Sequence, residues 1–88
     1  MDYRALERRV KGFANHRRIQ ILELLRKIPE MSVDEIAREL RINFKTASEH
    51  IRRLAIAGLV IKRNQGNEVR HKLTERAQSI LKFLRILE

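Results

Sequence analysis

The chain of 88 residues contains no cysteine and no tryptophan, and only one proline and three glycines. Without cysteine, neither a disulfide nor a thiolate metal site can contribute to stability or to redox sensing. The longest apolar runs span a few residues, such as Leu59-Val60-Ile61, whereas a membrane-spanning helix requires roughly 20. No signal-peptide pattern opens the chain. We therefore expect a cytoplasmic protein that makes no membrane contact.

The composition is that of a small packed domain with a strongly basic surface. Apolar residues make up 43% of the chain and charged residues 35%, which fits one domain, 1–88, whose small core would gain from a second subunit. Lys and Arg outnumber Asp and Glu by 20 to 11, a net charge of +9. The excess is greatest over residues 41–72, with eight basic residues against two acidic ones. This distribution indicates a polyanionic partner, although a uniformly solvated basic surface would give the same composition.

Capping residues and apolar spacing predict three helices in the first half of the chain. Asp2 can cap a first helix that ends near residues 12–15, with an apolar stripe of Tyr3, Leu6, Val10 and Phe13. A second helix should run over about 16–28, before Pro29, with its inward face formed by Ile19, Ile21, Leu22, Leu25 and Ile28. Ser32 and Glu35 have capping-box spacing, so we expect a short third helix over about 33–40.

The second half of the chain predicts a helix-turn-helix followed by a hairpin. Asn43 suits the N-cap of a fourth helix, with a core stripe of Ala47, Ile51 and Leu54 and a left-handed end at Gly58. Segments 59–61 and 69–73 then resemble strands joined through the polar loop 64–67. Thr74 can cap a last helix that ends near residue 87. This order predicts a mainly α winged helix-turn-helix fold with a two-stranded β-wing.

The last helix is apolar beyond a single stripe, because six of the residues over 79–87 are apolar. A wide core stripe with a frayed end would explain this pattern, and so would a helix shared with a second subunit. We favour the second explanation, with the flanking helices of 1–13 and 75–88 forming a homodimer interface. The candidate interface residues are Tyr3, Leu6, Val10, Ile80, Phe83, Leu84 and Leu87.

Three segments between Phe13 and Leu73 carry a family resemblance: ANHRRIQIL at 14–22, SVDEIA at 32–37, and TASEHIRRL at 46–54 followed by AGLV at 57–60. The last run has the form T-x-S-x-H-(L/I)-x-x-L-x-x-A-G-L-V. With it, the chain resembles the ArsR-like winged-helix regulators, which have MarR-type and PadR-type relatives. LTERA at 73–77 is similar to the LTxxG opening of the final helix in related regulators. The resemblance implies a homodimer that binds an operator of inverted-repeat symmetry and usually represses transcription.

The fourth helix presents a candidate DNA-reading face opposite its core stripe. With Asn43 as the cap, this face carries Phe44, Lys45, Ser48, Glu49 and Arg52. In a major groove, Lys45 can donate to guanine, Glu49 can accept from cytosine and Ser48 can do either. Phe44 departs from the polar residue common in the family. It can contact a thymine methyl or, alternatively, join the core stripe.

Other basic and polar residues are better placed for phosphates than for bases. Arg41, Thr46 and Arg53 flank the reading face of the fourth helix, next to its N-terminal amides. The hairpin carries Lys62, Arg63, Asn64, Gln65, Asn67 and Arg70. An arginine in such a wing can enter a narrow minor groove, and Arg63 and Arg70 are our first choices for that role. The alternative is a solvated hairpin whose charges discourage edge pairing.

Metal and cofactor sites are not expected. Many members of the family sense metals through cysteines in the third helix or through His and Asp on the terminal helices. Here there is no cysteine, the last helix has no histidine, and His16, His50 and His71 lie on separate elements without ligand spacing. We interpret these histidines as structural. Nothing in the sequence specifies a small-molecule effector.

The sequence contains no nucleophile–base arrangement, paired carboxylates or glycine-rich phosphate loop, so an enzyme is not expected. We predict sequence-specific binding of double-stranded DNA by a homodimeric transcriptional regulator, with repression implied by the resemblance. Two alternatives stay open: a winged helix that binds protein partners, and a low-specificity protein that coats DNA. The separation of the basic middle segment from the apolar last helix favours the regulator.

Overall fold

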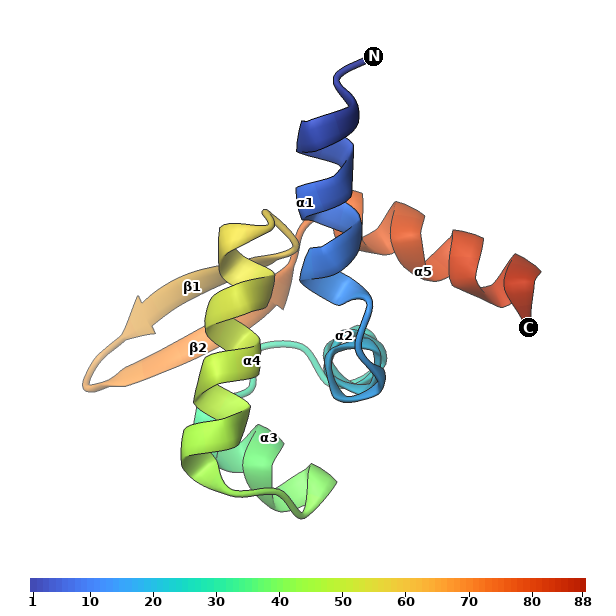
Figure 1. The fold of residues 1–88 in the computed structure, drawn as a ribbon. Coiled ribbons are helices and arrows are strands. Elements are labelled where there is room, and N and C mark those ends of the chain that lie inside the picture. The colour runs from blue at the N-terminus through green and yellow to red at the C-terminus, as the bar shows by residue number, and fades with distance from the viewer.

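The computed structural model describes all residues, 1–88, and contains five helices and one antiparallel two-stranded sheet (Figure 1). The helices are α1 (Tyr3–Phe13), α2 (His16–Lys27), α3 (Val33–Leu40), α4 (Phe44–Ile56) and α5 (Glu75–Leu87). The strands are β1 (Val60–Gln65) and β2 (Glu68–Leu73), and they form the wing between α4 and α5. The predicted winged helix-turn-helix fold is confirmed.

Four of the five helices begin at the predicted capping residues, and α2 begins after Asn15, for which no cap was predicted. Asp2 accepts a hydrogen bond from the amide of Ala5, and Thr74 accepts one from the amide of Ala77. Ser32 forms a complete capping box with Glu35, in which each side chain accepts from the other residue's amide. These bonds satisfy amides that have no partner within the helix, which is why short polar residues determine where each helix starts.

The core lies between α2, α4 and the base of the wing. Its buried residues include Ile21, Leu22, Leu24 and Leu25 of α2, Ala47, Ile51 and Leu54 of α4, and Leu59, Val60 and Leu73 near the wing. Two residues predicted to face inward from α2 do not reach this core. Ile19 is half-buried, and Ile28 is 49% exposed because α2 ends at Lys27 and Ile28 lies in the extended segment beyond.

The wing is longer than its sequence predicted. The strands pair from Val60 with Leu73 out to Gln65 with Glu68, so residues 64 and 65, expected in a loop, belong to β1. A turn of only Gly66 and Asn67 joins the strands, with Gly66 in the left-handed region at φ 63°. A two-residue turn needs such a backbone, and glycine adopts it without steric cost.

The loop between α2 and α3 adds a third strand-like segment beside β2. Met31 forms an isolated antiparallel bridge with His71, and the amide of His71 donates to the carbonyl of Met31. The imidazole of His71 is 1% exposed, and its Nδ1 lies 2.8 Å from the same carbonyl. Burial lowers the pKa of His71, because the charged ring would lose its hydration. This histidine is therefore part of the core, in line with the structural role predicted for it.

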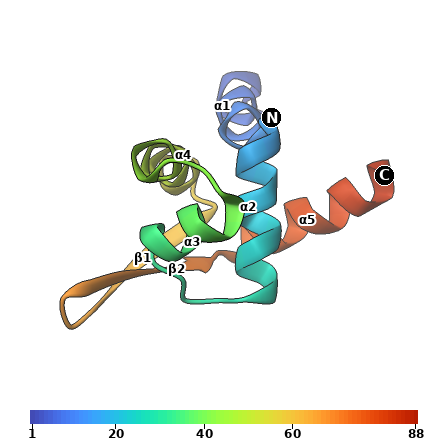
Figure 2. The same cartoon turned by 90° about the horizontal axis from the view of Figure 1, so that it is seen from below.

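Helices α1 and α5 leave much apolar surface uncovered. α5 projects away from the body, on the side opposite the wing (Figures 1 and 2). No residue of α1 is buried, and Tyr3 of its apolar stripe is 78% exposed. α5 buries only Ala77 and Leu81, and leaves Phe83, Ile86 and Leu87 exposed. No helix combines the length and apolar character that a membrane span requires.

Candidate nucleic-acid interface

The outward face of α4 is uncovered by the rest of the chain. Ala47, Ile51 and Leu54 are buried on its inner face, as predicted. On the outer face Lys45 and Phe44 are exposed, and Phe44 has 56% of its surface accessible. The alternative in which Phe44 joins the core stripe is therefore wrong. The remaining predicted residues of this face are Ser48, which is half-buried, and Glu49 and Arg52, which are exposed.

One carboxylate on this face is paired with two cations. Glu49 accepts two hydrogen bonds from Arg52 and a third, of 3.1 Å, from the Nε of Arg53. These partners, Arg52 first, lower the pKa of Glu49 to about 2. Glu49 is thus ionised throughout the physiological range, and it neutralises part of the charge of both arginines. Lys45 forms no salt bridge, so its ammonium group is available to a ligand.

The N-terminus of α4 is exposed together with the turn that precedes it. The side chain of Asn43 caps the helix by accepting from the amides of Lys45, at 2.7 Å, and Thr46, at 3.4 Å. Arg41 ends α3 in the left-handed conformation, at φ 56°, and this bend directs the chain into α4. Thr46 and Arg41 are both exposed, so they flank the end of the helix whose amides carry partial positive charge.

The wing arginines are held against the loop between α2 and α3. Arg63 and Arg70 occupy opposite positions in the sheet. Arg63 is exposed and forms a bidentate ion pair with Glu30. Arg70 is half-buried and donates to the carbonyl of Glu30 at 2.9 Å, to Glu35 at 3.3 Å, and to Glu68. The other predicted wing residues, Lys62, Asn64, Gln65 and Asn67, are exposed and make no side-chain hydrogen bond or salt bridge within the chain.

Sequence reasoning missed the acidic partners that position the wing. Glu30 adopts a left-handed φ of 69°, unusual for a residue other than glycine, and its carboxylate faces the wing. Arg63 lowers the pKa of Glu30 by hydrogen bonding and charge. No local pattern signals this pair, because its members are 33 residues apart in the chain. The structure contains no group of three or more His, Asp or Glu side chains that could hold a metal ion.

Comparisons with known proteins identify the family. Residues 15–62 match the family described as "Bacterial regulatory protein, arsR family", a segment that spans α2, α3, α4 and the start of the wing. The chain belongs to the ArsR family. Its fold and family are those of transcriptional regulators with a winged helix-turn-helix DNA-binding domain, and not of enzymes. A search of curated proteins gave no match.

Three solved structures illustrate how similar this ArsR-family chain is to its relatives. The homodimeric winged helix-turn-helix DNA-binding domain (fragment 1–100) of a possible ArsR-family regulator from Mycobacterium bovis is 31% identical, with a TM-score of 0.86 over 94% of this chain and 77% of that one. HlyU from Vibrio cholerae is 29% identical, with a TM-score of 0.83 over 99% and 97% of the chains. HlyU from Vibrio vulnificus, a transcriptional regulator, is 34% identical, with a TM-score of 0.75 over 89% and 81%.

Proposed function

We propose that this ArsR-family chain binds an operator in double-stranded DNA as a homodimer, in a sequence-specific manner, and thereby represses transcription in the cytoplasm. The observation that carries the proposal is the separation of two uncovered surfaces. The outward face of α4 and the wing expose mainly polar and basic side chains, whereas α1 and α5 each expose a stripe of apolar ones. The first surface fits a polyanion and the second fits another copy of the chain.

In this proposal, α4 lies in the major groove. Lys45 has no competing carboxylate and can donate to the O6 and N7 atoms of guanine. Phe44 is exposed at the first turn of α4, where its ring can contact a thymine methyl. Ser48 lies one turn further along the same face. Glu49 is engaged by Arg52 and Arg53, so a contact from Glu49 to cytosine competes with its two ion pairs.

Phosphate contacts would fix the register of the complex. Arg41 and Thr46 are exposed beside the amides at the start of α4, a natural binding position for a phosphate. In the wing, Lys62 and the polar tip residues Asn64, Gln65 and Asn67 are free to approach the DNA backbone or the minor groove. Arg63 can do so by leaving its exposed pair with Glu30. Arg70 is engaged by more acceptors and mainly holds the wing in position.

The homodimer would form through α1 and α5. Their exposed apolar residues are an aggregation hazard in a free monomer, and a two-fold partner would cover them. The Mycobacterium bovis relative, 31% identical, is described as homodimeric. The residues assigned to the interface are Tyr3, Leu6, Val10, Ile80, Phe83, Leu84 and Leu87. Ile80 and Leu84 are half-buried against the core of the same chain, and the other five are exposed. Such a dimer would present two copies of α4 at a fixed spacing, which matches an inverted-repeat site.

Selection of bound sequences from a random duplex pool tests the proposed function, with the mass of the protein in solution measured by sedimentation. The expected result is a dimer and an enriched palindrome. Binding without an enriched palindrome would instead indicate a protein that coats DNA. No binding at low salt would leave a protein-interaction module as the explanation.

Single substitutions then test the roles of the residues. Lys45→Ala should cost roughly 1–3 kcal/mol at one base pair and relax the preference there. Lys27→Ala, at the exposed end of α2, is the matched control. Leu6→Glu should convert the dimer to a monomer in sedimentation, whereas Ile61→Glu, which alters an exposed apolar residue of the wing, should leave the dimer intact.

A further inference from the structure

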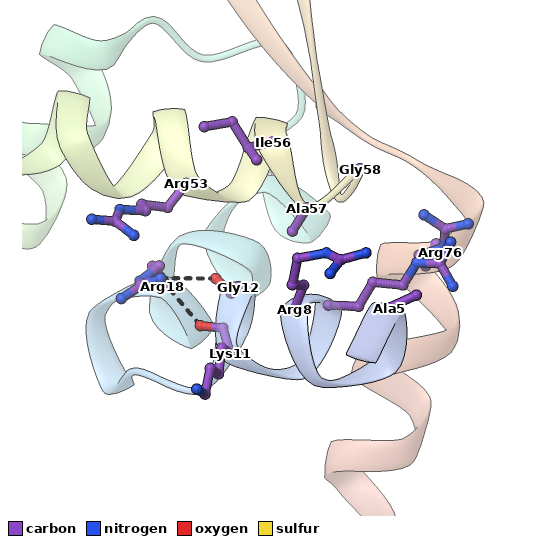
Figure 3. A pocket seen from close by; sticks show the side chains of 11 residues that line it. Ala5, Arg8, Lys11, Gly12, Arg18, Arg53, Ile56, Ala57, Gly58 and Arg76 are labelled. Atoms are coloured by element: carbon purple, nitrogen blue, oxygen red, sulfur yellow. Dashed lines mark hydrogen bonds between the residues drawn. The ribbon is translucent and has the colours of Figure 1, made fainter. Parts of the chain in front are cut away.

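An open groove of about 510 Å³ lies between α1, the start of α2, the C-terminal end of α4 and the start of α5 (Figure 3). Its lining contains six cationic residues and no acidic one. The cations are Arg8, Arg9, Lys11, Arg18, Arg53 and Arg76. The rest of the lining consists of small or apolar residues, so nothing within the groove neutralises this charge.

The close crossing of α1 and α4 brings these cations together. A methyl group at Gly12 would overlap the Cβ of Ala57, so the helices approach each other only because residue 12 is glycine. At the other end of the groove Gly58 turns the chain, at φ 75°, and a Cβ built there would lie 2.8 Å from the guanidinium of Arg76. Side chains from four helices, α1, α2, α4 and α5, therefore converge on one space.

The positive charge of the groove is largely uncompensated. Arg8, Arg9, Arg18 and Arg76 form no salt bridge, and Lys11 pairs only with the exposed Glu7, at 3.5 Å. Arg18 is fixed in place, since its Nη1 donates to the carbonyls of Lys11, at 3.3 Å, and Gly12, at 3.1 Å (Figure 3). Its buried Nε has no acceptor within the chain.

The positive charge of Arg18 also affects the pKa of a neighbouring histidine, His50. The pKa of His50 on α4 is lowered by burial first and by the charge of Arg18 second. Glu49, which precedes His50 on α4, raises the pKa by a smaller amount, and His16 and Arg17 lower it further. Of these residues only Arg18 lines the groove.

We propose that this groove binds phosphate groups, and that the sugar-phosphate backbone of operator DNA supplies them. Arginine is the side chain best suited to phosphate, because its planar donors match the phosphate oxygens. Arg53 lines the groove and also pairs with Glu49 on the outward face of α4, so the cations continue directly from the surface proposed to bind DNA. Six cations along an open groove exceed what one small anion requires, whereas a DNA strand provides successive phosphates.

This inference rests on the proposed function and extends the DNA footprint from α4 and the wing to α1. It assigns α1 two roles on different faces. Tyr3, Leu6 and Val10 face a second subunit in the proposed dimer, while Arg8 and Gly12 lie on the side of α4. The groove contacts carry no sequence information, so they add affinity and register and not base preference.

The test is the salt dependence of DNA binding by the full chain on its selected operator. In the variant, Arg8→Gln is combined with Arg9→Gln. The matched control combines Arg4→Gln on α1 with Lys27→Gln on α2, two exposed cations outside the groove. The slope of log K against log salt falls by about 0.9 for each phosphate that the protein no longer neutralises. If the pair neutralises one phosphate in each subunit, the slope of the dimeric groove variant should fall by about two, and that of the control should not change.

Several outcomes distinguish this inference from the proposed function. Equal slopes for the groove variant, the control and the wild type would overturn the inference alone. Failure of the wild type to bind any duplex would overturn the proposed function and the inference with it. Titration with inorganic pyrophosphate, followed by amide shifts of Gly12, Ala57 and Gly58, is the second readout. Saturable shifts there with an unchanged DNA slope would assign the groove to a small phosphate ligand and overturn the DNA assignment. Thermal unfolding verifies that each variant is folded.

Discussion

The carboxylate of Glu49 holds the guanidinium of Arg52 through two hydrogen bonds, from Nη2 to Oε1 at 2.6 Å and from Nε to Oε2 at 2.9 Å. Both residues lie on the outward face of α4, and Arg53 donates to the same carboxylate. A single acidic residue therefore restrains two cations next to the proposed DNA surface. An acid at this position opposes binding to phosphates in general, so it favours selectivity over affinity.

Glu49→Gln should increase affinity for every duplex, operator or not, roughly fivefold. The substitution removes one negative charge and releases Arg52 and Arg53 to interact with phosphates. Fluorescence anisotropy on operator and scrambled duplexes measures the change. Glu39→Gln on α3 alters the same charge at an exposed residue without an ion pair and is the control. Weaker binding to all duplexes would mean that Glu49 orients the arginines productively.

The elements that sequence predicted correctly depend on signals within a few residues. Asn43 caps α4 through amides two and three positions away, and Gly58 ends it by its own backbone conformation. The features that were missed depend on residues far apart. Glu30 meets the wing only after the chain has folded, and the groove exists because Gly12 packs on Ala57. The arginines of α1 are visible in the sequence, but the surface they form is not.

Gly12→Ala should destabilise the protein by about 1–2 kcal/mol. At an exposed helical position the same change stabilises by about 1 kcal/mol, since alanine is the better helix former. Here the added methyl group would overlap the Cβ of Ala57 and force α1 away from α4, and such overpacking typically costs about 1–3 kcal/mol. The free energy of unfolding in urea measures the outcome.

A double-mutant cycle with Ala57→Gly separates the overlap from other effects of the substitution. Removing the methyl group of Ala57 makes room for the one added at residue 12, so the two substitutions together should be more stable than the sum of their separate effects predicts. A coupling energy near zero would mean that a methyl group at residue 12 does not overlap that of Ala57, and that α1 and α4 lie further apart than described.

Arg70→Ala should reduce stability more than Arg63→Ala does, by about 1–2 kcal/mol, although both arginines lie on the wing. Arg70 is half-buried and donates to the carbonyl of Glu30 and the carboxylate of Glu35, so its removal leaves the carbonyl of Glu30 without a partner. Arg63 has one exposed ion pair, of a kind that contributes little to stability.

In DNA binding the order of the two wing variants should be reversed, so that Arg63→Ala weakens binding more than Arg70→Ala does. Arg63→Ala should weaken binding to all sequences and lower the salt slope by about 1 for each phosphate that Arg63 neutralises. Thermal melts and anisotropy on the same two variants measure both quantities. Equal stabilities would contradict the anchoring role of Arg70, and an unchanged salt slope for Arg63→Ala would remove Arg63 from the DNA surface.

Acidification should destabilise the fold partly through His71. Its pKa lies below the usual 6.5 because the ring is buried, so below that pH the unfolded chain binds more protons at this residue than the folded one. The free energy of unfolding should therefore fall as the pH is lowered through about 6.5, the pKa of histidine in the unfolded chain, with a contribution from this residue of at most ~1.4 kcal/mol per pH unit. His71→Asn keeps a donor for the carbonyl of Met31 but cannot titrate, so its profile should be flatter. His50, whose pKa is also lowered, keeps some slope in both proteins. Parallel profiles for the wild type and His71→Asn would show that the buried ring is not the source of the pH dependence of stability.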